Sequence, residues 1–222
     1  MKILFCNITW MKYYKGIYPQ VDETYNGGSY VADTGDAHEK YNFDAVNLIG
    51  LDDLPDGDYC LGFVETKSTT GTKQNQLHLE KIDGCDNLKD EDKVEDVLVI
   101  YCASHPYHKT TFVVGWYKNA VVYRNYRIQS FPSDQGDEYL QYYNAIAKKE
   151  DCVLMPVSTR IDMKKWKVPR KKDKAACGFG SANVWFATDD NQLCKDFVSR
   201  IVKQIDEYNG ENWIDEYPNL NS

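Results

Sequence analysis

Three consecutive runs of apolar and aromatic residues between positions 97 and 129 constrain the fold most strongly. They read VLVIYCAS, TTFVVGWY and AVVYRNYRIQ, with short polar stretches between them. Runs of this length and residue type are typical of β-strands, and the first is apolar enough to be buried on both faces. Lys118-Asn119 separates the second run from the third, and Asn tolerates positive φ, so the pair predicts a tight hairpin turn.

Other segments on both sides of this centre also have strand character. KILFCNITW, DYCLGFVETK and CVLMPV predict strands, and LHLEKI predicts a further short one. The segment at 137–151 has acids early and lysines late, as the helix dipole prefers, and predicts an amphipathic helix.

A second helix is predicted near the end of the chain. Thr188 or Asp189 can cap its first turn, and Asn209-Gly210 can end it. Its apolar stripe repeats every four residues, and we expect the stripe to face the core. The stripe consists of Leu193, Phe197, Ile201 and Ile205.

Many strands with few helices predict an α+β fold. We expect a curved, mostly antiparallel sheet or a small β-barrel with two or more flanking helices. Strands and helices do not alternate as in βαβ units, which argues against a doubly wound sheet. We expect residues 1–210 to form one domain for nucleic-acid recognition, and 211–222 to form a tail or a linker to a further domain.

Charge is distributed unevenly along the chain. The net charge is -8, and a uniformly acidic surface would repel nucleic acid. The segment at 160–174, however, has eight basic residues against two acids. Such asymmetry is typical of a binding face on an acidic protein, although an ordinary solvated loop can have the same composition.

The amino-terminal segment and the cysteines predict a cytoplasmic protein. Residues 1–14 lack the long apolar region and small-residue cleavage site of a secretory signal, and no apolar run reaches the length of a membrane span. Seven cysteines are present without a CxxC pair. We expect Cys6, Cys60 and Cys102, which lie in strand-like runs, to be reduced and buried.

Aromatic residues make up 14% of the chain, and many lie at strand ends or in glycine-rich loops. Rings in such places can stack on a base, whereas the ordinary alternative is that they pack the sheet. Trp116 is the ring that we expect to lie outside the core. The NGGSY segment at 26–30 can bring its backbone close to a ligand. Polar candidates for reading a base edge are Asn26, Ser29, His38, Asn42 and Asn183.

A catalytic alternative rests on Asp56, Glu65 and Lys67. Their spacing in PDGDYCLGFVETK is similar to the PD-(D/E)xK signature, in which two carboxylates hold a divalent cation and a lysine orients water. The motif is short, PDG is also an ordinary turn signal, and strand alternation can send Glu65 and Lys67 to solvent. The His105-x-x-His108 pair has Pro106 between its histidines and no neighbouring cysteine, so no metal site is expected there. No cofactor is expected.

Four ordered blocks carry a resemblance to a known class of proteins. MKILFCNITWMKYYKG, NGGSYV with YNF, VGWYKNAVVYRNY and GFGSANVWFA together resemble the amino-terminal domain of prokaryotic HNH-type and modification-dependent restriction endonucleases. Such domains are similar to the PUA, EVE and YTH β-barrels. The resemblance implies nucleic-acid binding, with a flipped modified base in an aromatic pocket. It implies base contacts from Trp10, Ser29, Tyr30, Asn42, Phe43, Trp116 and Trp185.

The resemblance is incomplete, because nothing after Trp185 resembles the ββα-metal module of an HNH nuclease. We therefore expect a module that reads a modified base in double-stranded DNA, as the specificity domain of a fused or separate restriction or defence nuclease. A metal-dependent nuclease and a protein-interaction module with a tyrosine-rich face are the alternatives. No membrane contact is expected. The predicted phosphate contacts are Lys12, Lys15, Lys118, Arg124, Lys164, Lys165, Lys167, Arg170 and Lys171.

Overall fold

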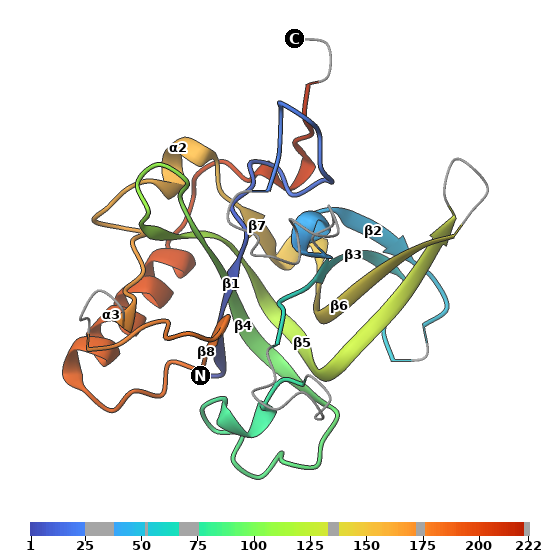
Figure 1. Ribbon diagram of the computed structural model, residues 1–222. Coiled ribbons are helices and arrows are strands. Elements are labelled where there is room, and N and C mark those ends of the chain that lie inside the picture. Colours follow the sequence, from blue (N-terminus) through green and yellow to red (C-terminus); the bar gives the residue numbers. More distant parts are fainter. Residues whose placement is uncertain (25–37, 52, 67–75, 133–137, 172–175, 220–222) are drawn as a thin grey trace.

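The computed structural model describes residues 1–24, 38–51, 53–66, 76–132, 138–171 and 176–219 (Figure 1). Its strands are β1 (Ile3–Ile8), β2 (Ala45–Leu48), β3 (Gly57–Gly62), β4 (Lys93–Ser104), β5 (Thr111–Pro132), β6 (Glu138–Lys148), β7 (Cys152–Leu154) and β8 (Val184–Trp185). Its α-helices are α2 (Val157–Arg160) and α3 (Gln192–Asp206). Short 3-10 turns are η1 (His38–Tyr41), η2 (Leu79–Lys81), η3 (Lys149–Asp151) and η5 (Trp213–Asp215).

The strands of the described residues form one mixed, open and curved sheet. Its order is β2-β3-β6-β5-β4-β1-β8, and β7 adds to β5 beside β6. Only the β1–β4 pair among them is parallel. The predicted α+β class with a curved, mostly antiparallel sheet is therefore confirmed. The small-barrel alternative stays a prediction.

The predicted hairpin turn at Lys118-Asn119 is wrong, because β5 runs through it without a break. Asn119 does have positive φ, at 50°, but it lies at a β-bulge. Between the Val97–Ala120 and Val99–Tyr117 pairs, β5 contains one residue more than β4. A bulge of this kind bends a strand and increases its twist. A second register shift, between Val122 and Arg127 of β5, lies where the β4 pairing ends and the projecting β5–β6 ribbon begins (Figure 1).

The predicted helix at 137–151 is also wrong, because Glu138–Lys148 forms β6. This strand pairs with β5 along one edge and with β3 along the other. Tyr139, Tyr142 and Tyr143 favour strand geometry. Long-range backbone pairing to two neighbours outweighs the helical charge pattern. LHLEKI likewise contains the 3-10 turn η2 instead of a strand.

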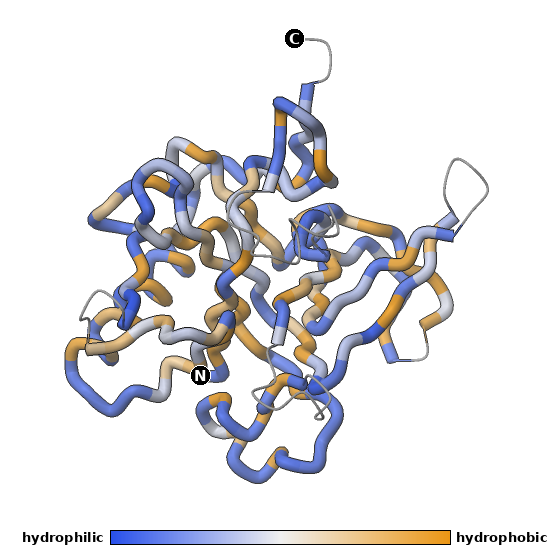
Figure 2. The backbone as a smooth tube through the Cα atoms, in the orientation of Figure 1, coloured by the Kyte–Doolittle hydropathy of each residue, from blue (hydrophilic) through white to orange (hydrophobic). Residues whose placement is uncertain are grey.

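A large core lies where β1, β4 and β5 meet α3, and a smaller cluster lies on the other face of β3 and β6. Figure 2 shows hydrophobic residues along the central strands and mostly hydrophilic ones between η2 and β4. All seven cysteines are buried free thiols, which agrees with the expectation for Cys6, Cys60 and Cys102.

Helix α3 begins two to three residues later than predicted. Asn191 caps it, and its side-chain oxygen accepts a hydrogen bond from the Cys194 amide. Ile201 and Ile205 of the predicted stripe are buried, but Leu193 is 70% exposed. The stripe is therefore oblique to the core.

The packed structure extends past the boundary predicted at residue 210. Ile214 is 6% exposed, and Asn212 holds η5 against β7. The Asn212 amide group donates to the Cys152 carbonyl and accepts from the Leu154 amide. Residues 212–215 thus belong to the folded structure and do not form a free linker. No helix among the described residues is long and apolar enough to cross a membrane.

Candidate nucleic-acid interface

The predicted base-binding residues that the structure describes are all buried. Ser29 and Tyr30 lie outside the described residues. No side chain of the remaining set offers an open ring face or a free polar edge to a base. Exposures are 6% for Trp10, 0% for Asn42, 0% for Phe43, 1% for Trp116 and 6% for Trp185.

Trp116 packs in the core, which corrects the prediction that it lies outside. Its indole stacks on that of Trp166, with ring centroids 5.8 Å apart, and it meets Tyr208 edge-on at 5.2 Å. Phe43 is enclosed in the same way by Tyr14, Tyr101 and Tyr117. These rings stabilise the fold and cannot stack on a base without unfolding part of it.

Trp10 and Trp185 occupy structural positions as well. Trp10 packs edge-on against His105, with the Arg160 guanidinium 5.7 Å from its ring centroid. The Trp185 indole N–H donates to Asp189 at 2.7 Å, and its ring packs on Phe5. Aromatic content alone did not distinguish such rings from accessible ones.

Asn42 and Asn144 act as buried amide clamps on the chain that follows β3. The Asn42 side chain donates to the Phe63 carbonyl at 2.9 Å and accepts from the Phe63 amide at 2.8 Å. Asn144 makes the same pair of bonds to Val64. Each clamp satisfies both backbone groups of its residue, as burial requires. Together they fix the position of residues 63–66.

Three of the predicted phosphate contacts are structural cations. The Lys15 ammonium donates to the carbonyls of Phe43 and Ile214. Arg124 binds the loop around η2 through Glu80 and backbone carbonyls. Arg170 donates to Asn7 and to the Thr111 hydroxyl. These groups are not available to a phosphate.

The other predicted phosphate contacts lie at the surface. Lys118 pairs with Asp206, Lys171 pairs with Asp189, and the Lys12 ammonium lies 4.7 Å from the Tyr13 ring centroid. Lys164, Lys165 and Lys167 are exposed and form no ion pair with a described acid. These last three are the best remaining candidates for binding an anion.

The geometry argues against the nuclease alternative. Asp56 and Glu65 lie before and after β3, whose six residues at about 3.3 Å each span roughly 20 Å between them. The Asp56 carboxylate accepts from the Gly50 amide, as expected in a turn. Lys67 lies outside the described residues. Within the described part of the chain, no group of three or more His, Cys, Asp or Glu side chains could hold a metal ion.

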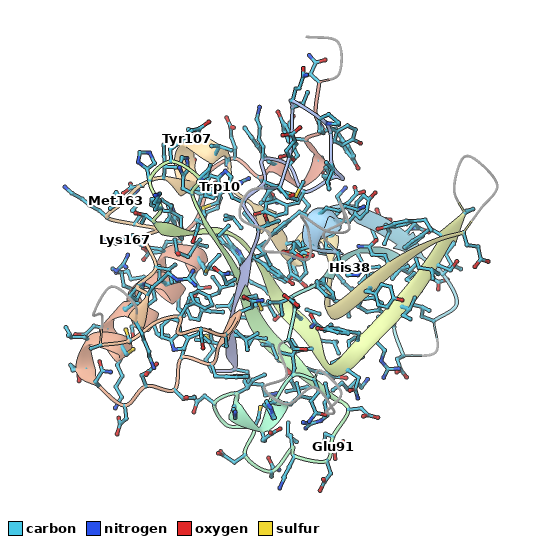
Figure 3. The ribbon with its side chains drawn as sticks, in the orientation of Figure 1. Trp10, His38, Glu91, Tyr107, Met163 and Lys167 are labelled. Atoms are coloured by element: carbon cyan, nitrogen blue, oxygen red, sulfur yellow. The ribbon has the colours of Figure 1, made fainter. Side chains whose placement is uncertain are left out.

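A different set of rings meets at the surface, and we name it the His38 cluster: His38, Phe63, Tyr126 and Tyr142 (Figure 3, where His38 is labelled). The His38 ring centroid lies 5.1 Å from Phe63 and 4.8 Å from Tyr142, and Phe63 lies 5.0 Å from Tyr126. The rings come from η1, β5, β6 and the clamped segment after β3. All except Phe63 are partly exposed.

Polar groups border the His38 cluster on one side. The Tyr126 hydroxyl accepts from the Thr66 amide and shares a second 2.8 Å hydrogen bond with the Thr66 hydroxyl. Burial raises the pKa of Tyr126, the Thr66 hydrogen bonds oppose this, and the carboxylates of Glu65 and Glu39 raise it further. The Asn183 amide donates to the Glu65 carboxylate at 3.4 Å. The cluster therefore combines aromatic faces with the exposed carboxylate of Glu65, whereas the Glu39 carboxylate accepts from the Thr9 amide.

His38 and Asn183 were among the polar candidates in the sequence, and the structure places both at or beside this cluster. Nothing in the sequence distinguishes Tyr126 and Tyr142 from the other tyrosines as residues of a site. Tyr142 lies in the segment predicted as a helix, and its partners are distant in sequence. Chemically, the cluster can stack a planar group and accept hydrogen bonds from amino groups.

No protein-family model, curated protein or solved structure matches the chain.

Proposed function

We propose that this protein is a nucleic-acid-binding module that holds an extruded DNA base at the His38 cluster. The observation that carries the proposal is the meeting of four rings from separate elements at a partly exposed surface. Stacking on aromatic side chains contributes about 1–3 kcal/mol per base, which is comparable to the few kcal/mol that extrusion costs. The clamps at Asn42 and Asn144 support the proposal, because they hold the segment that carries Phe63 in place before a ligand arrives.

The exposed Glu65 carboxylate favours a base with an exocyclic amino group. Its charge raises the pKa of Tyr126, and it accepts a hydrogen bond from the Asn183 amide beside the cluster. Carboxylates accept hydrogen bonds from the amino group of cytosine, and adenine presents a comparable donor. A modified cytosine or adenine is thus the ligand class that we propose. The resemblance to restriction-enzyme amino-terminal domains supports a role as the specificity module of a defence nuclease.

Fluorescence titration with short duplexes tests the proposal. The full chain is mixed with unmodified duplexes and with duplexes that contain modified cytosine or adenine, at two salt concentrations. Tyr142→Ala removes a cluster ring, and Tyr107→Ala is the matched control because Tyr107 is 81% exposed on another loop. Circular dichroism and urea unfolding check that each variant is folded.

We expect one modified duplex to bind at least tenfold more tightly than its unmodified counterpart, with a weak dependence on salt. Tyr142→Ala should abolish that preference and Tyr107→Ala should not. Equal, steeply salt-dependent binding to all duplexes would instead indicate phosphate contacts alone. That result, or a folded Tyr142→Ala variant with unchanged selectivity, would overturn the proposal.

A further inference from the structure

A groove separates α3 from the loop that precedes β8, and we name it the α3 groove. It has a volume of about 500 Å³, within the range of ordinary ligand sites. Met163, Cys177, Leu193 and Phe197 form much of its apolar lining, and Lys167 and Arg200 contribute its cations. Figure 3 labels Met163 and Lys167 on the left of the molecule and His38 to the right of the central strands. The groove and the His38 cluster are therefore separate surfaces.

The apolar lining is unusually accessible. Leu193 is 70% exposed and Met163 is 52% exposed. Leu193 and Phe197 lie one turn apart on α3, whereas Ile201 and Ile205 continue into the core. Adjacent exposed aliphatic side chains of this kind mark interaction sites, since their burial by a partner is favourable.

The cations around the groove are fixed in part by the fold. The Arg200 guanidinium lies 5.2 Å from the Phe197 ring centroid and donates to the carbonyls of Lys164 and Lys165. These bonds hold the described part of the basic segment, residues 160–171, which we name the basic loop, beside α3. Lys167 is exposed and lines the groove together with Arg200, so the two add positive charge there. The groove thus has an apolar floor and a positive rim on a protein whose net charge is -8.

We propose that the α3 groove binds an acidic amphipathic helix of a partner protein. From Leu193 to Arg200 the groove wall spans about 10 Å, or two helical turns, at about 1.5 Å per residue. A helix of matching length presents apolar side chains at i, i+3 or i+4, and i+7, the usual pattern of helix-in-groove recognition. Asp and Glu on the flanks of that stripe complement Lys167 and Arg200.

Two other modes of recognition fit less well. The groove is bounded by a helix and a loop, so an added β-strand has no edge to pair with there. A nucleic-acid backbone would use the lysines, but it would gain little from contact with Leu193 and Met163. The combination of exposed aliphatic carbon and positive charge therefore favours a protein ligand, and nucleic acid becomes an outcome of the test.

A displayed library of helical peptides provides the test. Each peptide is sixteen residues long, with Leu, Ile, Met or Phe on one stripe and Glu or Lys chosen at random on the two flanks. The library is selected against the full chain, and also against its Leu193→Ser and Lys167→Glu variants. Ile49→Ser is the control, because Ile49 is 74% exposed and lies in a loop that is distant in sequence from the groove residues.

We expect selection to enrich Glu over Lys on the flanks, and the best peptides to lose at least tenfold in affinity for Leu193→Ser but not for Ile49→Ser. Lys167→Glu should reduce or reverse the preference for Glu. The proposal is overturned if no peptide is selected, or if the selected peptides bind Leu193→Ser normally. It is also overturned if a 20-base-pair duplex displaces the peptides and itself needs Leu193. The peptide test depends on Leu193 and the duplex test depends on Tyr142, which lies outside the groove. A negative result in one test therefore leaves the other proposal standing.

Discussion

The indole rings of Trp116 and Trp166 stack with their planes inclined by 24°, which joins the centre of β5 to the basic loop. Trp166 is 3% exposed, although exposed lysines flank it on both sides. The stack therefore anchors the loop that forms one wall of the α3 groove. The Trp116–Trp166 contact therefore helps to hold Met163 and Lys167, which lie on the same loop, in place beside α3.

Trp116→Ala should lower the free energy of unfolding by about 3–5 kcal/mol, because it leaves a large cavity in the core. Urea denaturation measures this. A double-mutant cycle with Trp166→Ala should give a coupling of about 0.5–1.5 kcal/mol from the ring pair. Tyr107→Ala should change stability by less than about 0.5 kcal/mol, since exposed positions contribute little. Loss of base selectivity without loss of stability in Trp116→Ala would contradict the core assignment.

Gly62→Ala should destabilise the protein by overpacking its core. A Cβ atom at Gly62 would overlap the Tyr101 hydroxyl and lie 2.8 Å from the Tyr117 ring, and both rings are fully buried. Overpacking of this kind costs about 1–3 kcal/mol or more. Thermal unfolding of Gly62→Ala and of Gly180→Ala provides a matched comparison, because a Cβ atom at Gly180 meets nothing within 4 Å. Equal melting temperatures for the two variants would refute the crowding at Gly62.

Lowering the pH should reduce the free energy of unfolding, because Glu80 becomes protonated. Partial burial alone would raise the pKa of Glu80. Hydrogen bonds from its own backbone, from Arg124 and from His78 outweigh burial and lower the pKa to about 2 from an ordinary value of 4.5. A lowered folded-state pKa stabilises the protein fully above about pH 4.5, and this contribution is lost as the pH falls toward 2. The contribution is on the order of 2 kcal/mol.

Urea midpoints between pH 6 and pH 2 measure this effect, with Glu80→Gln as the variant. Glu80→Gln should be less stable at pH 6, and its deficit should shrink toward pH 2 as the wild-type carboxylate is protonated. A constant deficit across the range would show that the charge of Glu80 does not stabilise the η2 loop.

Lys15→Met should release the segment around η5. The Lys15 ammonium is buried and donates to the Ile214 carbonyl at 2.6 Å, so its loss leaves buried carbonyls without a donor. Such a loss costs about 1–3 kcal/mol. Chymotrypsin should then cleave near Trp213 and Tyr217 at least several-fold faster. Lys149→Met is the control, because Lys149 pairs with Asp215 at the surface, where ion pairs contribute little. Equal cleavage rates for both variants would contradict this prediction.

The sequence predicted the strands with continuous apolar character well. The β4 segment and the first half of β5 were recognisable because β-branched and aromatic residues fill them. The β6 error has a physical cause: Glu138 and Lys148 suit a helix dipole, and only pairing with β3 and β5 decides in favour of a strand. The hairpin turn predicted at Lys118-Asn119 is wrong for a related reason. Asn119 has the expected positive φ, but that conformation occurs in β-bulges as well as in turns.

The candidate site was predictable only in part. His38 and Asn183 were selected for their polar edges, whereas Trp116 and Phe43 were selected for rings that the core encloses. Ring accessibility depends on contacts between distant segments, such as that between Trp116 and Trp166. Local sequence does not contain that information.

The hydrogen bond from Lys15 to the Ile214 carbonyl spans 199 positions, which has a consequence for biosynthesis. A ribosome adds roughly 5–20 residues per second, so about 10–40 seconds separate the synthesis of the two partners. During that interval the Lys15 ammonium has the Phe43 carbonyl as a partner but no η5 carbonyl. The nascent chain therefore cannot complete the set of hydrogen bonds at Lys15 until η5 has been translated.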